Sequence, residues 1–299
     1  MLVFSSFLLG PMMAITSSNW WVIWLMMEIL TFSMIVSIYF SNSLILSEVS
    51  MIYFVAQSVS GVFLLVGGSY VIQLLNSSNM FLFMLSLGLT LKLGLFPTHF
   101  WVLPLVSMIS YWQIAFLLGP MKIIPLNLLL TLGSDSWGHL FLLSLGFMSM
   151  LYGSKLGIMM ASIKGVLGAS SITHSGWFIL AYSYNLLWVY FWAYYFSLLL
   201  FLMSMTFLMG KMAAWGMLSL SGLPPFVLFF AKASVVWAVL SSFSSPLLLV
   251  LPLLSAMISL YFYLKYVYSL WLSSTMDNSS SMMWFVMPNM FMGSMLLML

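Results

Sequence analysis

The chain has 299 residues, of which 64% are hydrophobic and only 4% are charged, and its formal net charge is +3. A soluble domain carries about 25% charged residues, so this composition excludes a water-soluble globular fold. The absence of cysteine excludes disulfides and cysteine-ligated iron–sulfur clusters. Without arginine, the chain also lacks the usual side chain for binding nucleic acid.

Long apolar runs follow one another along the whole chain. A spanning helix needs about 20 mostly apolar residues, and such runs, bounded by polar residues or by Gly and Pro, predict an all-α polytopic transmembrane bundle of about eleven helices. The first run lacks a basic segment and a small-residue cleavage site, so we expect a spanning helix and not a signal peptide. The predicted helices lie roughly at 2–17, 20–40, 50–75, 80–99, 107–128, 138–154, 160–184, 186–209, 216–241, 246–272 and 283–299.

Lysines near the predicted helix ends indicate how the chain is oriented. Lys155 and Lys164 flank the loop between the sixth and seventh predicted helices. Lys211 lies between the eighth and ninth, and Lys265 lies towards the end of the tenth. All four then fall on one side, which the positive-inside rule assigns to the cytoplasm or the mitochondrial matrix. We expect the N-terminus on that side and the C-terminus on the opposite side, which is the intermembrane space in a mitochondrion.

Four charged residues lie well inside predicted helices: Glu28, Lys92, Lys122 and Lys232. A lysine at the centre of a spanning helix costs about 2.5 to 3.5 kcal/mol, so its presence indicates a function. Two alternatives remain: each lysine extends its side chain to the membrane surface, and Glu28 is a protonated carboxyl bound to a neighbouring helix. A carboxylate beside a buried lysine can exchange a proton with it. We therefore predict that these four residues translocate protons.

Two segments are expected to be discontinuous helices. In LKLGLFPTHFW, near residues 92–100, and in LSLSGLPPFVLFFAK, near residues 219–232, glycine and proline interrupt the helix close to a buried lysine. Irregular backbone at membrane depth is tolerated only where it is buried in protein or lines a wet cavity. Interrupted helices in corresponding places of two halves indicate an ion pathway in an inverted-repeat transporter.

The spacing of these interruptions predicts how the chain is divided. They are centred about 130 residues apart, which suits two halves of five helices each. We expect one transmembrane domain over 1–299, with a first half of about 1–128, a second half of about 138–272 and a C-terminal helix at 283–299. Its connections are too short for a domain outside the membrane, so the function is expected within the bilayer or at its faces.

The three histidines occur in unrelated contexts, so no haem or metal site is expected. His99 follows the first interruption, and His174 lies in SSITHSGW within the seventh predicted helix. Because histidine titrates near neutral pH, each could relay protons, and the alternative is a hydrogen bond between helices. His139 lies beside Trp137 at a helix entrance, where we expect it at the membrane interface.

Four motifs in a fixed order resemble the NADH dehydrogenase subunit 2 family, the antiporter-like membrane subunits of mitochondrial respiratory complex I. The motifs are YFVAQSVSGVFLL, LKLGLFPTHFWV, SSITHSGW and LSLSGLPPFVLFFAK, and the resemblance covers about residues 19–268. It implies an antiporter-like fold and a location in the mitochondrial inner membrane. The full fold of this kind has fourteen helices, and the animal form of the family lacks the first three. The resemblance also implies a proton-translocating subunit of NADH:ubiquinone oxidoreductase that itself binds no NADH, FMN, iron–sulfur cluster or ubiquinone. The implied partners are other membrane-arm subunits and lipids, including cardiolipin.

The resemblance also assigns residues by their positions in the motifs. Glu28 matches the buried glutamate of the family, Lys122 its central lysine, and Lys92 and Lys232 the lysines of its two broken helices. The two histidines of the SSITHSGW and PTHFW motifs, His174 and His99, match motif histidines. The family often reads HFWVPE where this chain reads HFWVLPL, so no acidic residue follows the first broken helix.

Two other classes of function stay open on the sequence. The chain could be a stand-alone antiporter that exchanges cations for protons, or a membrane scaffold that conducts nothing. A proton-translocating subunit requires the buried charges to lie close enough to exchange protons.

Overall fold

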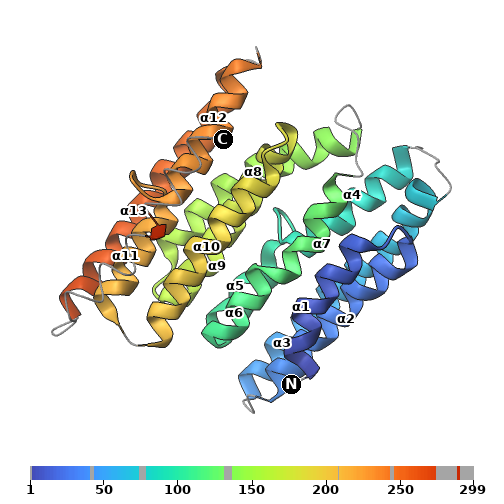
Figure 1. Cartoon of the computed structure of the whole chain (residues 1–299), viewed down its shortest axis with the longest axis horizontal. Helices are drawn as coiled ribbons and strands as arrows, with labels where there is room; N and C mark the ends of the chain where they lie inside the picture. The colour runs from blue at the N-terminus through green and yellow to red at the C-terminus, as the bar shows by residue number, and fades with distance from the viewer. Residues whose placement is uncertain are drawn as a thin grey trace.

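The computed structural model describes residues 2–40, 44–73, 79–130, 137–207, 209–242, 246–273 and 288–289, which are nearly all helical and contain no strand. The predicted C-terminal helix at 283–299 therefore lies almost wholly outside the described residues. Figure 1 shows the helices side by side, with the first three at one end of the long axis and the last three at the other.

The helices of the first part are α1 (Leu2–Thr16), α2 (Trp20–Tyr39), α3 (Leu44–Gly68), α4 (Asn79–Leu93), α5 (Val102–Met108), α6 (Tyr111–Leu118) and α7 (Pro120–Leu129). Those of the second part are α8 (Trp137–Met159), α9 (Ile163–Ser183), α10 (Leu187–Thr206), α11 (Gly210–Ser221), α12 (Val227–Ser241) and α13 (Val250–Ser273). Three short helices are η1 (Ser69–Gln73), which continues α3, η2 (His99–Trp101) and η3 (Pro246–Leu249).

Six helical segments of the described chain are long and apolar enough to cross a membrane. This confirms an all-helical, multi-pass membrane fold. Several expected spans are divided between two shorter helices, so their parts do not reach spanning length alone. The six segments are Trp20–Tyr39, Leu46–Val71, Tyr111–Leu129, Gly138–Met159, Leu187–Thr206 and Val250–Leu272.

Both predicted interruptions are confirmed. At the first interruption, α4 ends before Gly94, which has a φ of 69°, and the chain becomes helical again in η2 and α5. At the second interruption, α11 ends before Gly222, which has a φ of 77°, and the chain becomes helical again in α12. A left-handed residue after the last helical turn ends a helix, and glycine adopts that conformation without the strain of a side chain.

The span predicted at 107–128 corresponds to the spanning segment Tyr111–Leu129, which begins later than expected and contains an interruption that was not predicted. Helix α5 ends at Met108, and a third interruption separates α6 from α7 at Gly119 and Pro120. Pro120 begins α7 in the first helical position, where its missing N–H is tolerated. Gly119 packs against the ring of Tyr195, which a Cβ atom at this position would overlap. Hydropathy does not register this interruption, because both sides of it are apolar.

Helix α9 is the central helix of the bundle. Its residues from Gly165 to Tyr182 are all buried, although many of them are Ser, Thr, Gly or His. Small residues allow α8 to approach it closely: a Cβ atom on Gly176 would lie 2.5 Å from the carbonyl oxygen of Gly146. Such contacts are typical of helix packing in membranes. A polar helix is therefore enclosed by protein and shielded from lipid.

Candidate functional site

Glu28 on α2 and Lys92 on α4 form an ion pair, with 3.2 Å between Oε1 and Nζ. The side chains of Lys92 and Glu28 are 5% and 18% exposed. The pair occupies space next to Gly61 of α3, where a Cβ atom would overlap the Glu28 carboxylate. Thr31 donates a hydrogen bond to the Glu28 carbonyl at 2.7 Å. Two of the charges predicted from the sequence thus compensate each other inside the bundle.

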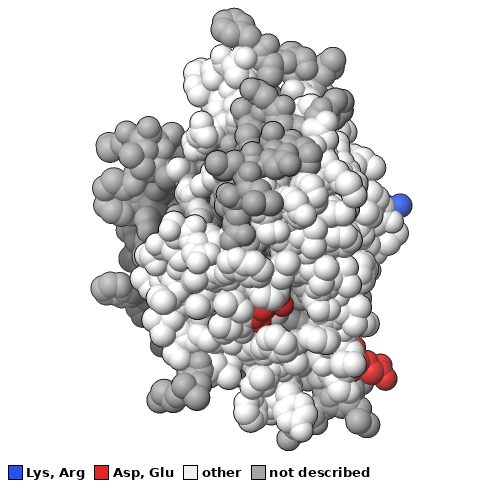
Figure 2. Space-filling model, turned by 90° about the vertical axis from the view of Figure 1, so that its right-hand side faces the viewer, with Lys and Arg blue, Asp and Glu red and all other residues white. Residues whose placement is uncertain are grey.

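The outer side of this pair is partly open. Figure 2 shows the side of the molecule on which the first helices lie, and it carries almost no charge apart from acidic atoms in a hollow and at one edge and a lysine atom at the right-hand edge. Since Glu28 is 18% exposed and Lys92 only 5%, the carboxylate is the more accessible member of the pair. The lysine is enclosed by the bundle.

The broken end of α4 is held by side chains of the PTHFW motif and by α9. The Thr98 hydroxyl donates to the carbonyl oxygen of Thr90 at 3.0 Å, and Trp101 Nε1 donates to that of Leu91 at 3.1 Å. The Leu93 carbonyl lies 3.1 Å from a hydroxyl of α9. A helix end leaves its last carbonyls without partners in the helix, and these bonds supply them. The motif therefore stabilises the interruption next to Lys92.

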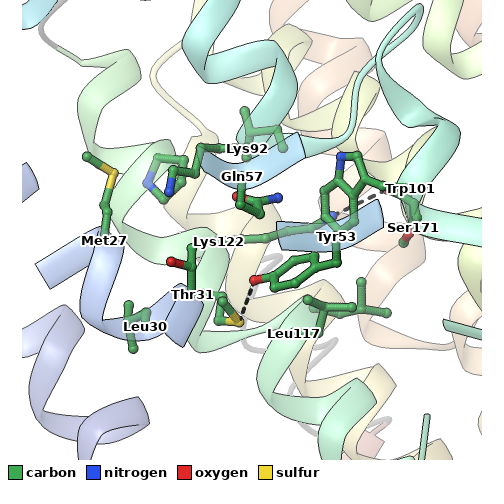
Figure 3. A pocket seen from close by; sticks show the side chains of 15 residues that line it. Met27, Leu30, Thr31, Tyr53, Gln57, Lys92, Trp101, Leu117, Lys122 and Ser171 are labelled. Atoms are coloured by element: carbon green, nitrogen blue, oxygen red, sulfur yellow. Dashed lines mark hydrogen bonds between the residues drawn. The ribbon is translucent and has the colours of Figure 1, made fainter. Parts of the chain in front are cut away.

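A cavity of about 30 Å³ joins Lys92 to Lys122. Figure 3 shows both lysines along its wall together with Tyr53 and Gln57 of α3. A water molecule needs about 10–15 Å³ of such volume and two to four polar partners. The cavity therefore has the size and the polar groups to hold one or two waters between the lysines. Its lining also includes Thr31 of α2 and Ser171 of α9.

Lys122 lies in the first turn of α7, just after the third interruption, and is 5% exposed. Its Nζ donates to Ser175 Oγ at 2.9 Å and to the Ser171 carbonyl at 3.5 Å. The ring of Phe178 lies 5.7 Å from the same nitrogen. Because all three partners belong to α9, the side chain points into the bundle and not towards the membrane surface. The alternative of an extended, surface-seeking lysine is wrong for this residue.

Lys232 of α12 faces the second interruption. Its Nζ donates to the carbonyl of Ser221, the last residue of α11, at 3.1 Å. The ring of Trp177 on α9 lies 5.8 Å away. A Cβ atom on Gly222 would lie 3.1 Å from Nζ, so the glycine also leaves room for the ammonium group. A carbonyl released by the broken helix thus binds this lysine.

His174 lies on α9 between the partners of the two lysines. Its Nδ1 is 2.8 Å from the Tyr190 hydroxyl. Helix α9 places Phe178 and Trp177 next to different lysines, with His174 one turn before them. The structure therefore brings His174 into the row of predicted residues, within a fully buried helix.

The other two histidines lie elsewhere. His99 packs against the rings of Phe96 and Tyr152, at centroid distances of 5.8 and 5.1 Å, and is not among the residues that line the cavity. His139 is 5% exposed, with Nε2 3.2 Å from the Ser183 hydroxyl. It lies in the first turn of α8 with its side chain buried against α9, and its position at the membrane interface stays a prediction.

The lysines that were used to predict orientation have different surroundings. Lys155 and Lys265 are exposed. Lys164 donates to the Ile109 carbonyl at 2.7 Å and lies 5.1 Å from the Tyr111 ring, so it joins the start of α9 to the turn before α6. None of these three lines the cavity between the buried lysines. The structure thus separates them from the buried set.

Several polar residues of the site were not predicted from the sequence. Gln57 is 3% exposed, Ser171 1% and Ser175 0%. Each is a polar residue within an apolar run of a predicted spanning helix, and this position in the sequence was the feature that could have indicated a role in the site. Serine is common in membrane helices as a partner of its own backbone, however, so the pattern does not say which serine contacts a lysine.

Comparisons with known proteins show the family and the fold of the chain. The family model described as NADH:quinone oxidoreductase/Mrp antiporter, TM matches residues 17–215. The NADH-ubiquinone oxidoreductase chain 2 of Albinaria caerulea is 38% identical over 261 residues, covering 87% of this chain and 85% of that protein. The protein of the same name from Myxine glutinosa is 32% identical, covering 86% and 81%. A chain of respiratory complex I from Thermus thermophilus with bound aureothin has the same fold, with a TM-score of 0.80 at 19% identity, covering 99% of this chain and 76% of that one.

Proposed function

The chain belongs to the family of NADH:quinone oxidoreductase and Mrp antiporter membrane subunits, and from this premise we propose that it is a core membrane-arm subunit of proton-pumping NADH:ubiquinone oxidoreductase, respiratory complex I. It is part of an enzyme through proton translocation, and the redox reaction takes place in other subunits. The observation that carries this function is a row of buried ionisable groups at the interrupted helices.

The row begins at the Glu28–Lys92 ion pair, continues across the cavity to Lys122, and reaches Lys232 along α9, whose Phe178 and Trp177 rings lie next to the two lysines. We assign proton translocation to these four residues and a relay to His174. His99 stays a separate proposal, as a relay at the first interruption. Each step of the row combines a titratable group with a polar neighbour that can pass or hold a proton.

The Glu28–Lys92 pair supports a switching step. If Lys92 passes a proton to Glu28, both become neutral, and the pair no longer stabilises separated charges in the bundle. The neutral amine can then accept a proton through the cavity from Lys122, whose ammonium is held by α9. Each transfer moves one proton and leaves one acceptor behind. Repeated in order, the transfers move protons laterally through the bundle.

We also propose the complete transmembrane arrangement. It comprises about eleven spans in an inverted repeat, with halves at about 1–128 and 138–272 and a last helix at 283–299. The two interruptions with left-handed glycines support the repeat. The chain would lie in the mitochondrial inner membrane with the N-terminus in the matrix and the C-terminus in the intermembrane space. Lys155 in the last part of α8 and Lys164 at the start of α9 support this orientation under the positive-inside rule.

The proposed partners are the other membrane-arm subunits of the complex, in a hetero-oligomer, and bilayer lipids including cardiolipin. The proposal includes no cofactor on this chain: NADH, FMN, iron–sulfur clusters and ubiquinone would be bound by other subunits. The large apolar surface of α1 to α3 supports contacts with lipid and with apolar surfaces of neighbouring subunits.

Lys122→Met in the assembled complex tests the proposed function. The expected result is a loss of most proton translocation per NADH oxidised, because the central proton carrier is absent. The measurement is the ratio of protons translocated to electrons transferred in membrane vesicles. Lys155→Met, which changes an exposed lysine, is the matched control and should leave the ratio unchanged.

An unchanged ratio in Lys122→Met would refute the assignment and favour a non-conducting scaffold. Exchange of Na⁺ or K⁺ for protons by the purified chain alone, in liposomes, would instead identify a stand-alone antiporter. The two experiments therefore separate the three classes of function.

A further inference from the structure

Ser175 of α9 lies between Lys122 and the broken end of α4. Its side chain is fully buried, and its Oγ accepts a hydrogen bond from Lys122 Nζ at 2.9 Å. Two acceptors are within reach of its own proton: the Leu93 carbonyl at 3.1 Å and the Ser171 carbonyl at 2.8 Å. A hydroxyl has one proton to donate, so it binds these two carbonyls alternately or shares its proton between them.

We propose that Ser175 is a positioning residue that couples the charge of Lys122 to the broken end of α4. An ammonium group has three donors and no acceptor, so Ser175 Oγ must accept from protonated Lys122 and direct its own proton to a carbonyl. A neutral amine has a lone pair. The Ser175 hydroxyl then donates to the amine and withdraws its proton from the Leu93 carbonyl.

The position of Leu93 gives this reversal a consequence. Leu93 is the last residue of α4, between Lys92 and the left-handed Gly94. The Thr90 and Leu91 carbonyls have partners within the same interrupted segment, whereas the Leu93 carbonyl receives its bond from another helix. A buried carbonyl without a partner is unfavourable, so the end of α4 loosens when Lys122 loses its proton.

Loosening this end changes the geometry of Lys92. Glu28 is held on α2, whereas Lys92 lies in the last turn of α4, one residue before the carbonyl in question. A shift of that turn changes the distance between Nζ and Oε1, which is now 3.2 Å. Ser175 thus transmits the charge of Lys122 to the ion pair without carrying the proton. The inference rests on the proposed proton-carrying role of Lys122.

The experiment is hydrogen exchange of the interrupted segment in the purified, assembled complex. Ser175→Ala should speed the exchange of amides in residues 94–98 by about five- to tenfold, because the helix end loses one charge-linked hydrogen bond. Lys122→Met should exchange like the unchanged protein, since methionine offers no lone pair and the Ser175 hydroxyl keeps donating to the carbonyl. A rise in pH that removes the proton of Lys122 should speed the exchange of the unchanged protein, after correction for the intrinsic exchange rate, and this rise should be absent from both Lys122→Met and Ser175→Ala.

Two variants serve as controls. Ser171→Ala removes an equally buried hydroxyl of α9 that donates to the Gly168 carbonyl and keeps the carbonyl next to Lys122, so exchange should stay at its normal rate. Ser175→Thr keeps the hydroxyl and should exchange like the unchanged protein. A pH-dependent rise in exchange that persists in Lys122→Met, or equal effects of Ser175→Ala and Ser171→Ala, would overturn the inference.

Proton translocation by Lys122→Met separates this inference from the proposed function. If translocation is lost but the pH-dependent rise in exchange persists in Lys122→Met, Lys122 carries protons and Ser175 does not couple it to α4. If translocation is normal while Lys122→Met abolishes the pH-dependent rise, the hydrogen-bond coupling exists, but the proposed function is wrong.

Discussion

The two interrupted helices share a backbone design and differ in how they hold their lysines. Each ends at a left-handed glycine, Gly94 after α4 and Gly222 after α11. Lys92 precedes its interruption and pairs with the Glu28 carboxylate, whereas Lys232 follows its interruption and binds a backbone carbonyl. The first site is therefore a neutral pair, and the second holds a cation with a dipole and an aromatic ring. One kind of helix break thus supports two different electrostatic environments for a buried lysine.

This difference gives the two sites different roles. Replacing either partner of the ion pair destabilises the protein, because the remaining charge is then buried in the bundle without an opposite charge. A lysine bound to a carbonyl and a ring has no opposite charge to leave behind. Assembly of the complex is therefore expected to depend more strongly on the charges of the first site. The charge of the second site is expected to matter mainly for proton transfer.

The largest effect is expected from Glu28→Gln, which leaves Lys92 without its carboxylate. Removing one partner of a buried pair costs about 3–5 kcal/mol, and the partial exposure of Glu28 favours the lower end. The amount and thermal stability of the assembled complex should fall. Adding Lys92→Met should restore assembly without restoring proton translocation. Glu48→Gln, at an exposed acid of α3, is the control. Normal assembly of Glu28→Gln alone would contradict the comparison.

Gly94→Ala should follow in size. The left-handed conformation costs a residue with a Cβ about 1–2 kcal/mol, and this Cβ would lie 2.5 Å from Val102 Cγ2. At Gly222→Ala the closest atom, at 3.1 Å, is the Nζ of a flexible lysine, so only the backbone strain applies in full. Thermal inactivation of the assembled complex should show a larger decrease for Gly94→Ala. Equal decreases would mean that packing at the two breaks is the same.

Trp101→Phe should have a smaller effect. It removes the hydrogen bond from Nε1 to the Leu91 carbonyl at the end of α4, at a cost of about 1–2 kcal/mol. Trp215→Phe on α11 is the matched variant, since Trp215 Nε1 has no hydrogen-bond partner among the described residues. Hydrogen exchange of the segment after α4 should increase only in Trp101→Phe. A similar increase after α11 in Trp215→Phe would show that ring size, and not the bond, matters.

The smallest effect on assembly is expected from Lys232→Met. A bond to the Ser221 carbonyl and the contact with the Trp177 ring are lost, but no charge is left unpaired and methionine removes the cost of burying a cation, so stability should change by about 1 kcal/mol or less. Proton translocation should nevertheless fall, because one proton carrier is missing. Native electrophoresis together with proton-to-electron ratios measures both quantities. An assembly defect as large as that of Glu28→Gln would remove the proposed distinction between the sites.

The two interruptions could be predicted because their causes are local. Glycine and proline within an apolar run change the backbone wherever the run is placed. The interruption at Gly119 was missed, since a single Gly–Pro pair within a short apolar stretch is compatible with a continuous helix. What decides it is the Tyr195 ring, which packs against Gly119 from another helix. The burial of His139 against α9 was likewise not predicted from its neighbours in sequence.

By itself, the sequence determined that the chain is a helical membrane protein and which charges must be buried, because hydropathy and helix-breaking residues act over a few neighbouring positions. The tertiary structure alone decided the partners of those charges. Glu28 and Lys92 are 64 residues apart in the chain, Lys122 and Ser175 are 53 apart, and Ser175 and Leu93 are 82 apart. Such contacts depend on how whole helices pack, and several serines of α9 offer the same chemistry to a nearby lysine. Packing selects among them the hydroxyl that meets both Lys122 and the end of α4.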